Sequence, residues 1–135
     1  MTGHHLTADL SGCPADRPPM TDPQALHALC LAAVHAAGLT PVAELFHVFP
    51  SPGGVTAVVL LAESHLAVHT WPERSEVTLD VYVCNVGTDN SAAALRLIDR
   101  LISAFAPQQV QRQRWLRGHG IGALNLDRVE TDIDT

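Results

Sequence analysis

Residues 62–73 read Ala-Glu-Ser-His-Leu-Ala-Val-His-Thr-Trp-Pro-Glu, and they follow directly on the most apolar run of the chain, Val55 to Leu61. An apolar run of this length, continued to Ala62, predicts a buried strand. Residues 65–71 have a strand-like pattern because Leu66, Val68 and Thr70 stand at every second position. Pro72 ends this second strand, since proline has no backbone N–H for a sheet ladder. The middle of the chain therefore predicts two consecutive strands.

Strand patterns also occur on both sides of this segment. Residues 76–84 alternate most cleanly, with Val77, Leu79, Val81 and Val83 facing one way and Thr78, Asp80, Tyr82 and Cys84 facing the other. Further strands are predicted from His5 to Leu10, from Pro41 to Phe49 and from Gln108 to Leu116.

Two helices complete the predicted fold. Asp22 caps the first, Pro23 occupies its first position and Gly38 stops it. The second runs from Asn90 or Ser91 to Phe105, and Pro107 ends it. Its apolar stripe is expected to be Leu95, Ile98, Leu101, Ile102 and Phe105. Two helices with one apolar face each and about six strands predict an α+β fold. We expect a two-layer sandwich, a mostly antiparallel sheet with both helices on one face, in a single domain of residues 1–135.

Composition limits the classes of function. Of the 135 residues, 47% are hydrophobic and 16% are charged, with a net charge of −6, which argues against nucleic-acid binding. No run approaches the ~18 apolar residues of a membrane span, and the N-terminus lacks a signal peptide, so we expect a cytoplasmic protein. The three cysteines, Cys13, Cys30 and Cys84, are odd in number and are expected to be free thiols.

The residues at 63–69 allow several chemistries. Ser64 is either an ordinary turn serine or a nucleophile, but it lacks the Gly-x-Ser-x-Gly elbow of a Ser-His-Asp hydrolase. His65 and His69 have the spacing of zinc ligands on a helix, yet their segment predicts a strand and no paired cysteines lie nearby, so we expect no metal. Cys84 is either a small buried residue or an exposed thiol that can transfer a proton.

The segment Glu63 to Glu73, followed by a strand that ends in Cys84, resembles the signature of the bacterial and archaeal S-adenosylmethionine decarboxylases. These are small pyruvoyl-dependent enzymes of polyamine synthesis. Residues 3–13, which begin Gly-His-His-Leu, are similar to the family's start, and Phe-His-Val-Phe at 46–49 is similar to its second strand. Arg-Gly at 117–118 lies where a late Arg-Gly is common. The resemblance covers most of the chain.

The resemblance implies that the chain cuts itself between Glu63 and Ser64, into a β chain of residues 1–63 and an α chain of residues 64–135. In this family the serine hydroxyl attacks the preceding carbonyl, the resulting ester eliminates, and the new N-terminus hydrolyses to a pyruvoyl group. His69 matches the family's processing base. Thr56 stands where the family commonly has a serine that assists processing, so a hydroxyl is retained on a stiffer side chain.

The resemblance also implies roles in turnover. The pyruvoyl group forms a Schiff base with the substrate amine and accepts electrons as CO₂ leaves. Cys84 matches the residue that reprotonates the product, which serves as the aminopropyl donor for spermidine. Phe49 and Leu66 match positions that hold the adenine, and Glu73 matches the position that holds the ribose hydroxyls.

The spacing of Ser64 and His69 raises a geometric problem. Five residues apart on one strand, they point to opposite faces and lie about 16 Å apart at ~3.3 Å per residue. We therefore expect a homodimer in which Ser64 and Cys84 of one subunit meet Thr56, His69 and Glu73 of the other.

Two alternatives stay open at this point. Some members of the family are thought to decarboxylate ornithine or arginine, for which Asp80, on the same strand face as Cys84, is an available acid. The second alternative is that the protein is a non-catalytic regulatory subunit, although such a subunit would not need Ser64, His69 and Cys84 together. Asn85 follows Cys84 where glycine is typical in the family, which bears on the backbone beside the expected proton donor.

Overall fold

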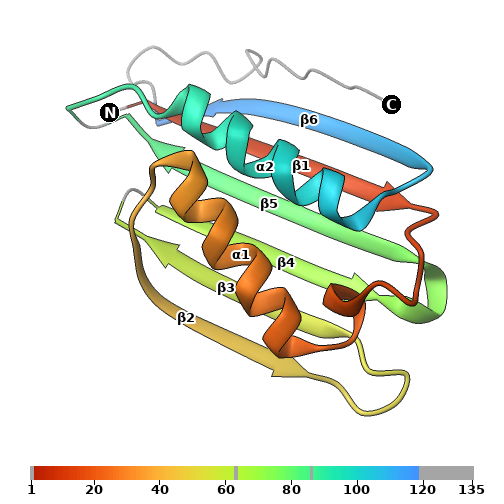
Figure 1. Cartoon of the computed structure of the whole chain (residues 1–135). Coiled ribbons are helices and arrows are strands. Elements are labelled where there is room, and N and C mark those ends of the chain that lie inside the picture. The colour runs from red at the N-terminus through yellow and green to blue at the C-terminus, as the bar shows by residue number, and fades with distance from the viewer. Residues whose placement is uncertain (1, 63, 86, 119–135) are drawn as a thin grey trace.

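A computed structural model of the chain describes residues 2–62, 64–85 and 87–118. In this part of the chain, six strands and two α-helices form two layers (Figure 1). The strands are β1 (Gly3–Ser11), β2 (Pro41–Val48), β3 (Val55–Leu61), β4 (Ser64–Trp71), β5 (Glu76–Cys84) and β6 (Gln109–Arg117). The helices are α1 (Pro23–Ala37) and α2 (Ser91–Phe105), and short 3₁₀ turns stand at η1 (Pro18–Met20) and η2 (Pro72–Arg74).

The strands form one sheet in the order β2-β3-β4-β5-β1-β6, and every neighbouring pair is antiparallel. Both helices lie on the same face of the sheet and pack against each other, as Figure 1 shows. This arrangement confirms the predicted two-layer α+β sandwich. The N-terminal strand β1 is inserted between β5 and β6, which no local pattern in the sequence indicates.

The predicted ends of α1 are confirmed. Asp22 accepts a hydrogen bond at Oδ1 from the backbone N–H of Gln24 (2.9 Å), as an N-cap residue does, and Pro23 is the first helical residue. At the other end Gly38 has φ 81°, a left-handed conformation that glycine adopts without a steric penalty.

The core lies between the sheet and the helices. Thr70 is a buried polar residue of β4, and its hydroxyl donates to the Met20 carbonyl oxygen (2.8 Å) and accepts from the Val55 N–H (2.8 Å). These bonds satisfy the hydroxyl and tie the loop before α1 to the middle of the sheet. Apolar side chains from both layers fill the rest of the core, among them Leu6, Leu10, Leu26, Val34, Val59, Leu66, Leu79, Leu97, Leu101 and Phe105.

The predicted stripe of α2 is partly wrong. Leu95 is 36% exposed, whereas Leu97 is fully buried. The buried face contains two alanines, Ala93 and Ala94, one turn before Leu97 and Ile98, and a search for large apolar residues passes over them. The stripe is therefore rotated relative to the prediction, and small side chains let the start of the helix lie close to the sheet.

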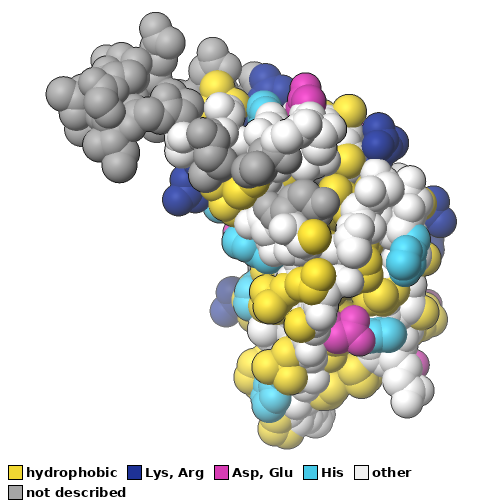
Figure 2. All heavy atoms as spheres, turned by 90° about the vertical axis from the view of Figure 1, so that its left-hand side faces the viewer, with side chains coloured by type: hydrophobic (Ala, Val, Ile, Leu, Met, Phe, Trp, Pro, Cys, Tyr) yellow, Lys and Arg dark blue, Asp and Glu magenta, His cyan; other side chains and the backbone are white. Residues whose placement is uncertain are grey.

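The second face of the sheet is covered by no element of the described chain. We call it the outer face; it carries the side chains of alternate residues on each strand, including Leu45, Thr56, Leu60, His65, His69, Asp80, Tyr82 and Cys84. Figure 2 views the end of the sandwich that lies at the left of Figure 1 and shows hydrophobic and histidine side chains exposed at that end. No described helix has the length and apolarity needed to cross a membrane.

Candidate active site

The two central residues of the sequence motif lie at opposite ends of β4. Ser64 is its first residue and pairs with Val83 of β5, whereas His69 pairs with Thr78 of β5 and with Thr56 of β3. At ~3.3 Å per residue the two lie about 16 Å apart along one strand, as the spacing in the sequence predicts. The site residues therefore form two groups, a serine group near Ser64 and a histidine group near His69.

The histidine group brings two predicted residues together. A hydrogen bond of 3.0 Å joins Thr56 Oγ1 and His69 Nδ1 on the outer face. Trp71 stacks on the His69 ring, with centroids 5.7 Å apart and 28° between the planes. The imidazole is thus held on two sides by its neighbours. Glu73 lies in the exposed turn η2, two residues after β4 ends at Trp71.

The serine group contains Cys84, the last residue of β5. Tyr82 lies on the same face two residues earlier, and burial raises the pKa of its hydroxyl, as does a hydrogen bond with the Cys84 thiol. The guanidinium of Arg117 lies over the Tyr82 ring, 5.5 Å from its centroid. Ser64 stands on the strand next to Cys84, opposite Val83. Glu63, the other residue of the expected cleavage site, lies outside the described residues.

The absence of a side chain at Gly3 leaves room for the Tyr82 ring. Gly3 of β1 pairs with Cys84, and a Cβ atom built on Gly3 would lie 2.6 Å from Cε1 of Tyr82. Any larger residue at this position would push the ring away from the thiol. Residue 3 therefore shapes the serine group from a strand that the sequence motif does not include.

Sequence reasoning missed a further cluster beside the serine group. His5 Nε2–H donates to Asp80 Oδ1 (2.5 Å), and Arg117 Nη1 donates to His5 Nδ1 (3.1 Å). The bond from His5 lowers the pKa of Asp80, against an opposing effect of burial. Alternation places His5 and Asp80 on polar strand faces, but only the pairing of β1 with β5 and β6 brings them together.

The predicted substrate-binding residues are placed unequally. Phe49 follows β2, is 48% exposed and contacts His47 edge-on, with ring centroids 4.7 Å apart. Leu66, by contrast, is fully buried in the core, on the helix side of the sheet. Its side chain does not reach the outer face, because it has the opposite parity on β4 from His65 and His69. Leu66 is therefore left out of the proposed substrate site.

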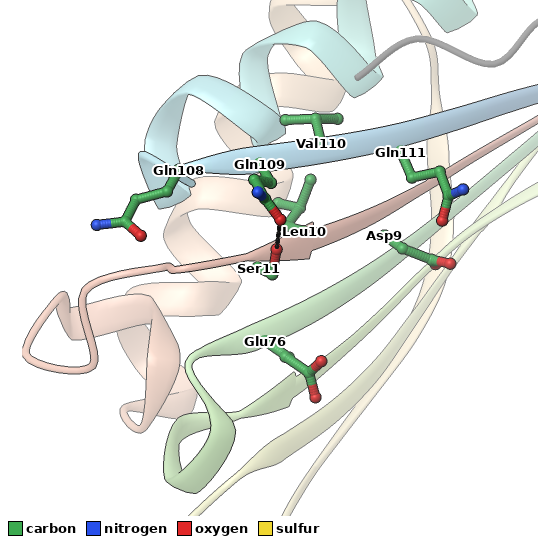
Figure 3. Close-up of a pocket in the computed structure, with 8 residues that line it drawn as sticks. All are labelled: Asp9, Leu10, Ser11, Glu76, Gln108, Gln109, Val110 and Gln111. Carbon is green, nitrogen blue, oxygen red and sulfur yellow. Dashed lines mark hydrogen bonds between the residues drawn. The ribbon is translucent and has the colours of Figure 1, made fainter.

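A hollow of about 660 Å³ lies at the end of β1 farthest from Cys84. Figure 3 shows its lining: the carboxylates of Asp9 and Glu76, the amide side chains of β6, and a hydrogen bond from the Ser11 hydroxyl to Gln109 (3.4 Å). None of the predicted site residues lines it.

The zinc spacing of His65 and His69 does not apply to the observed fold. Both residues lie on strand β4, where four residues span about 13 Å rather than one helical turn. Among residues 2–62, 64–85 and 87–118, no three potential ligands gather closely enough to hold a metal ion.

Comparisons with known proteins agree with this geometry. The family model described as S-adenosylmethionine decarboxylase matches residues 4–118. The S-adenosylmethionine decarboxylase proenzyme of Aquifex aeolicus is 38% identical over 116 residues, which cover 86% of this chain and 81% of that protein. The proenzyme of Pseudomonas aeruginosa is 35% identical over 123 residues, 91% of this chain and 74% of that protein.

An archaeal relative and a solved structure extend the comparison. The proenzyme of Pyrococcus furiosus is 35% identical over 104 residues, 77% of this chain and 73% of that protein. The crystal structure of the adenosylmethionine decarboxylase from Aquifex aeolicus superposes with a TM-score of 0.78 at 36% identity, covering 87% of this chain and 92% of that one. Fold, motif and relatives agree, and the chain belongs to the S-adenosylmethionine decarboxylase family.

Proposed function

We propose that this protein is a self-processing, pyruvoyl-dependent decarboxylase that acts on S-adenosylmethionine. The observation that carries the proposal is the hydrogen bond between Thr56 and His69 (3.0 Å) on the outer face. It orients an imidazole and a hydroxyl for proton transfer, while Ser64 and Cys84 lie on adjacent strands at the other end. Relatives over most of the chain are named as S-adenosylmethionine decarboxylase proenzymes, which supports a chain that matures by cleavage.

Self-cleavage needs three steps. The Ser64 hydroxyl adds to the carbonyl carbon before it, the peptide C–N bond breaks, and an ester with a free amine at residue 64 results. A base then removes the Cα proton of residue 64, and the Cβ–O bond breaks with release of the β chain as a carboxylate. Water hydrolyses the remaining enamine, through its imine, to a ketone and ammonia. We assign the removal of the Cα proton to His69, which Thr56 orients.

The residues beside Ser64 suit the product of this cleavage. A pyruvoyl group at this position supplies a ketone that condenses with the substrate amine and accepts the electrons released with CO₂. Cys84 is half-buried at the end of the neighbouring strand, next to the residue that pairs with Ser64. We assign to Cys84 the delivery of a proton to the product carbon. Ser64→Ala, which has no hydroxyl to attack, should stay a single chain on denaturing electrophoresis.

A second copy of the chain completes the site. One subunit cannot bring Ser64 to His69, because the two lie at opposite ends of β4 and have opposite parity on it. A second subunit packed against the outer face can bring its His69 to the end of β4 where Ser64 lies. Exposed apolar residues support such a contact: Leu45 is 74% exposed and Leu60 is 45% exposed, and both lie on the outer face. Burying them against a second copy would be favourable.

Mixed dimers test the shared site. Ser64→Ala and His69→Ala chains, each unable to cleave alone, should form a working site when they are produced together. In that site the His69→Ala chain supplies Ser64 and is cut. A control that mixes His69→Ala with a chain that carries both substitutions should give no fragments. If the first mixture also stays uncut, although the two chains associate, the shared site is refuted.

The outer face favours a nucleoside substrate. Phe49 offers an exposed aromatic face, and Glu73 an exposed carboxylate that can accept both ribose hydroxyls. Asp80, the acid available to ornithine or arginine, already accepts a hydrogen bond from His5 and lies 3.9 Å from His65. The deciding assay measures CO₂ release from S-adenosylmethionine, ornithine and arginine, each offered alone to the cleaved protein. Turnover of an amino acid with none of S-adenosylmethionine would overturn the substrate assignment.

A further inference from the structure

One histidine near the cleavage site has no role in the function proposed above. His65 lies next to Ser64 at the start of β4, and its Nδ1 atom is 3.4 Å from the Ser64 hydroxyl oxygen. Its other ring nitrogen, Nε2, lies 3.9 Å from Oδ1 of Asp80, a charge contact rather than a hydrogen bond. The imidazole therefore stands between a hydroxyl and a carboxylate of the same chain.

Asp80 is itself held from the other side. It accepts a hydrogen bond from His5, and Arg117 donates to the second nitrogen of His5 (3.1 Å). Arginine only donates, so His5 accepts at Nδ1 and carries its proton at Nε2, facing Asp80. Residues of β1 and β6 thus orient the Asp80 carboxylate, and its negative charge lies toward His65.

These contacts select a state of His65 suited to a base. A carboxylate near Nε2 favours the tautomer with the proton on Nε2, and the lone pair then lies on Nδ1, toward the Ser64 hydroxyl. From β5, Asp80 and Tyr82 face the ring, the latter with its ring centroid 5.9 Å away. The partner of His65 on β3 is the apolar Leu60, so no opposing charge enters from that strand.

We propose that His65 is the general base for the first step of self-cleavage, and that Asp80 is its positioning residue. Nδ1 takes the proton from the Ser64 hydroxyl as the oxygen adds to the preceding carbonyl carbon. When the C–N bond breaks, the same proton passes to the nitrogen of residue 64, so the imidazole ends neutral. This assignment rests on the proposed self-cleavage and goes beyond it by naming the base for the acyl shift.

The assignment separates two proton transfers. His69 cannot serve Ser64 of its own chain, because it lies at the far end of β4 and its Nδ1 atom is bonded to Thr56. His65 serves the hydroxyl proton within one chain, and His69 of the partner subunit serves the Cα proton. Loss of His65 therefore blocks ester formation, whereas loss of His69 lets the ester form and accumulate.

Hydroxylamine distinguishes the two blocks, because it splits an ester but leaves a peptide bond intact. Full-length chains are produced by cell-free translation, and cleavage after residue 63 is followed by denaturing electrophoresis with and without hydroxylamine. We expect His65→Ala and His65→Gln to cleave at least ~100-fold more slowly than the wild type, the lower end of a general-base effect. Hydroxylamine should release fragments from His69→Ala and none from the two His65 variants.

Further arms separate chemistry from folding. Added imidazole should restore part of the cleavage of His65→Ala, since a small base can enter the space left by the ring. Asp80→Asn should slow cleavage and Asp80→Glu should recover part of the rate, because only glutamate keeps the charge. His35→Ala, which removes an exposed imidazole of α1, is the matched control and should cleave normally.

The proposal is overturned if folded His65→Ala or His65→Gln cleaves within threefold of the wild type, or yields fragments with hydroxylamine as His69→Ala does. Folding is checked by the thermal unfolding of each variant. A wild-type chain that stays whole would overturn the proposed self-cleavage and this assignment together. A cleaving wild type with cleaving His65 variants overturns this assignment alone.

Discussion

The hydrogen bond between Thr56 and His69 allows a quantitative prediction. Thr56→Val replaces the hydroxyl by a methyl group of similar size, so it removes the 3.0 Å bond and keeps the β-branched shape. Both residues are half-buried on the outer face, and water can reach the freed imidazole nitrogen. The net loss is therefore that of one ordinary hydrogen bond, about 0.5–1.5 kcal/mol.

That loss converts into a rate. If the bond holds the imidazole in the geometry that removes the Cα proton, 0.5–1.5 kcal/mol slows cleavage roughly 2- to 13-fold. Thr56→Ser keeps the hydroxyl and should cleave at nearly the wild-type rate. Trp71 still stacks on His69 in both variants, so the ring is not expected to leave its place entirely.

The assay follows the appearance of the two fragments from freshly made chains by denaturing electrophoresis. Thr21→Val serves as the control, because Thr21 is exposed and lies between η1 and α1, outside the sheet. A Thr56→Val chain that cleaves as fast as the wild type would refute the role given to this bond. So would a Thr56→Ser chain that is as slow as Thr56→Val.

Three further predictions concern thiols, acid and the core. Burial raises the pKa of Cys13 to about 11 and that of Cys30 to about 12, so iodoacetamide at pH 8 should label only Cys84 in the native protein and all three thiols after denaturation, as counted by intact mass. The pKa of Asp80 is held below its ordinary 3.8, so its contribution to stability is present above that pH and is lost below it. The difference in melting temperature between wild type and Asp80→Asn should accordingly shrink in thermal unfolding as the pH falls below 3.8, and a constant difference would contradict this. On α2, Leu97→Ala should cost about 2–5 kcal/mol in urea unfolding and Leu95→Ala less than about 1 kcal/mol, and equal losses would contradict the observed buried face.

Local patterns in the sequence predicted the elements well. Alternation located β5 at residues 76–84, and Asp22, Pro23 and Gly38 marked the ends of α1, because these signals depend only on neighbouring residues. The same reasoning placed Ser64 and His69 too far apart for one chain, which the register of β4 confirms. Parity along a strand is a local property, so it could be read without knowing the sheet.

What depends on strand order could not be predicted. The sequence shows three polar residues on separate strands, but the insertion of β1 between β5 and β6 decides that His5 meets Asp80 and Arg117. Leu66 shows a different limit: the family resemblance implies a ligand contact at this position, whereas its parity with Val68 places its side chain in the core. The apolar stripe predicted for α2 omitted Ala93 and Ala94, because their burial comes from close packing rather than from hydrophobic size.

The strand order also determines what a cut after residue 63 would do to the molecule. The first fragment would contain β1, α1, β2 and β3, and the second would contain β4, β5, α2 and β6. Because β1 is hydrogen-bonded on both edges to strands of the second fragment, and β3 is paired with β4, the pieces would remain interleaved. Folding would be a one-molecule event before the cut and a two-molecule event afterwards. The mature protein, once unfolded by heat or urea, would regain its structure only after its two fragments meet, so its rate of refolding would depend on protein concentration.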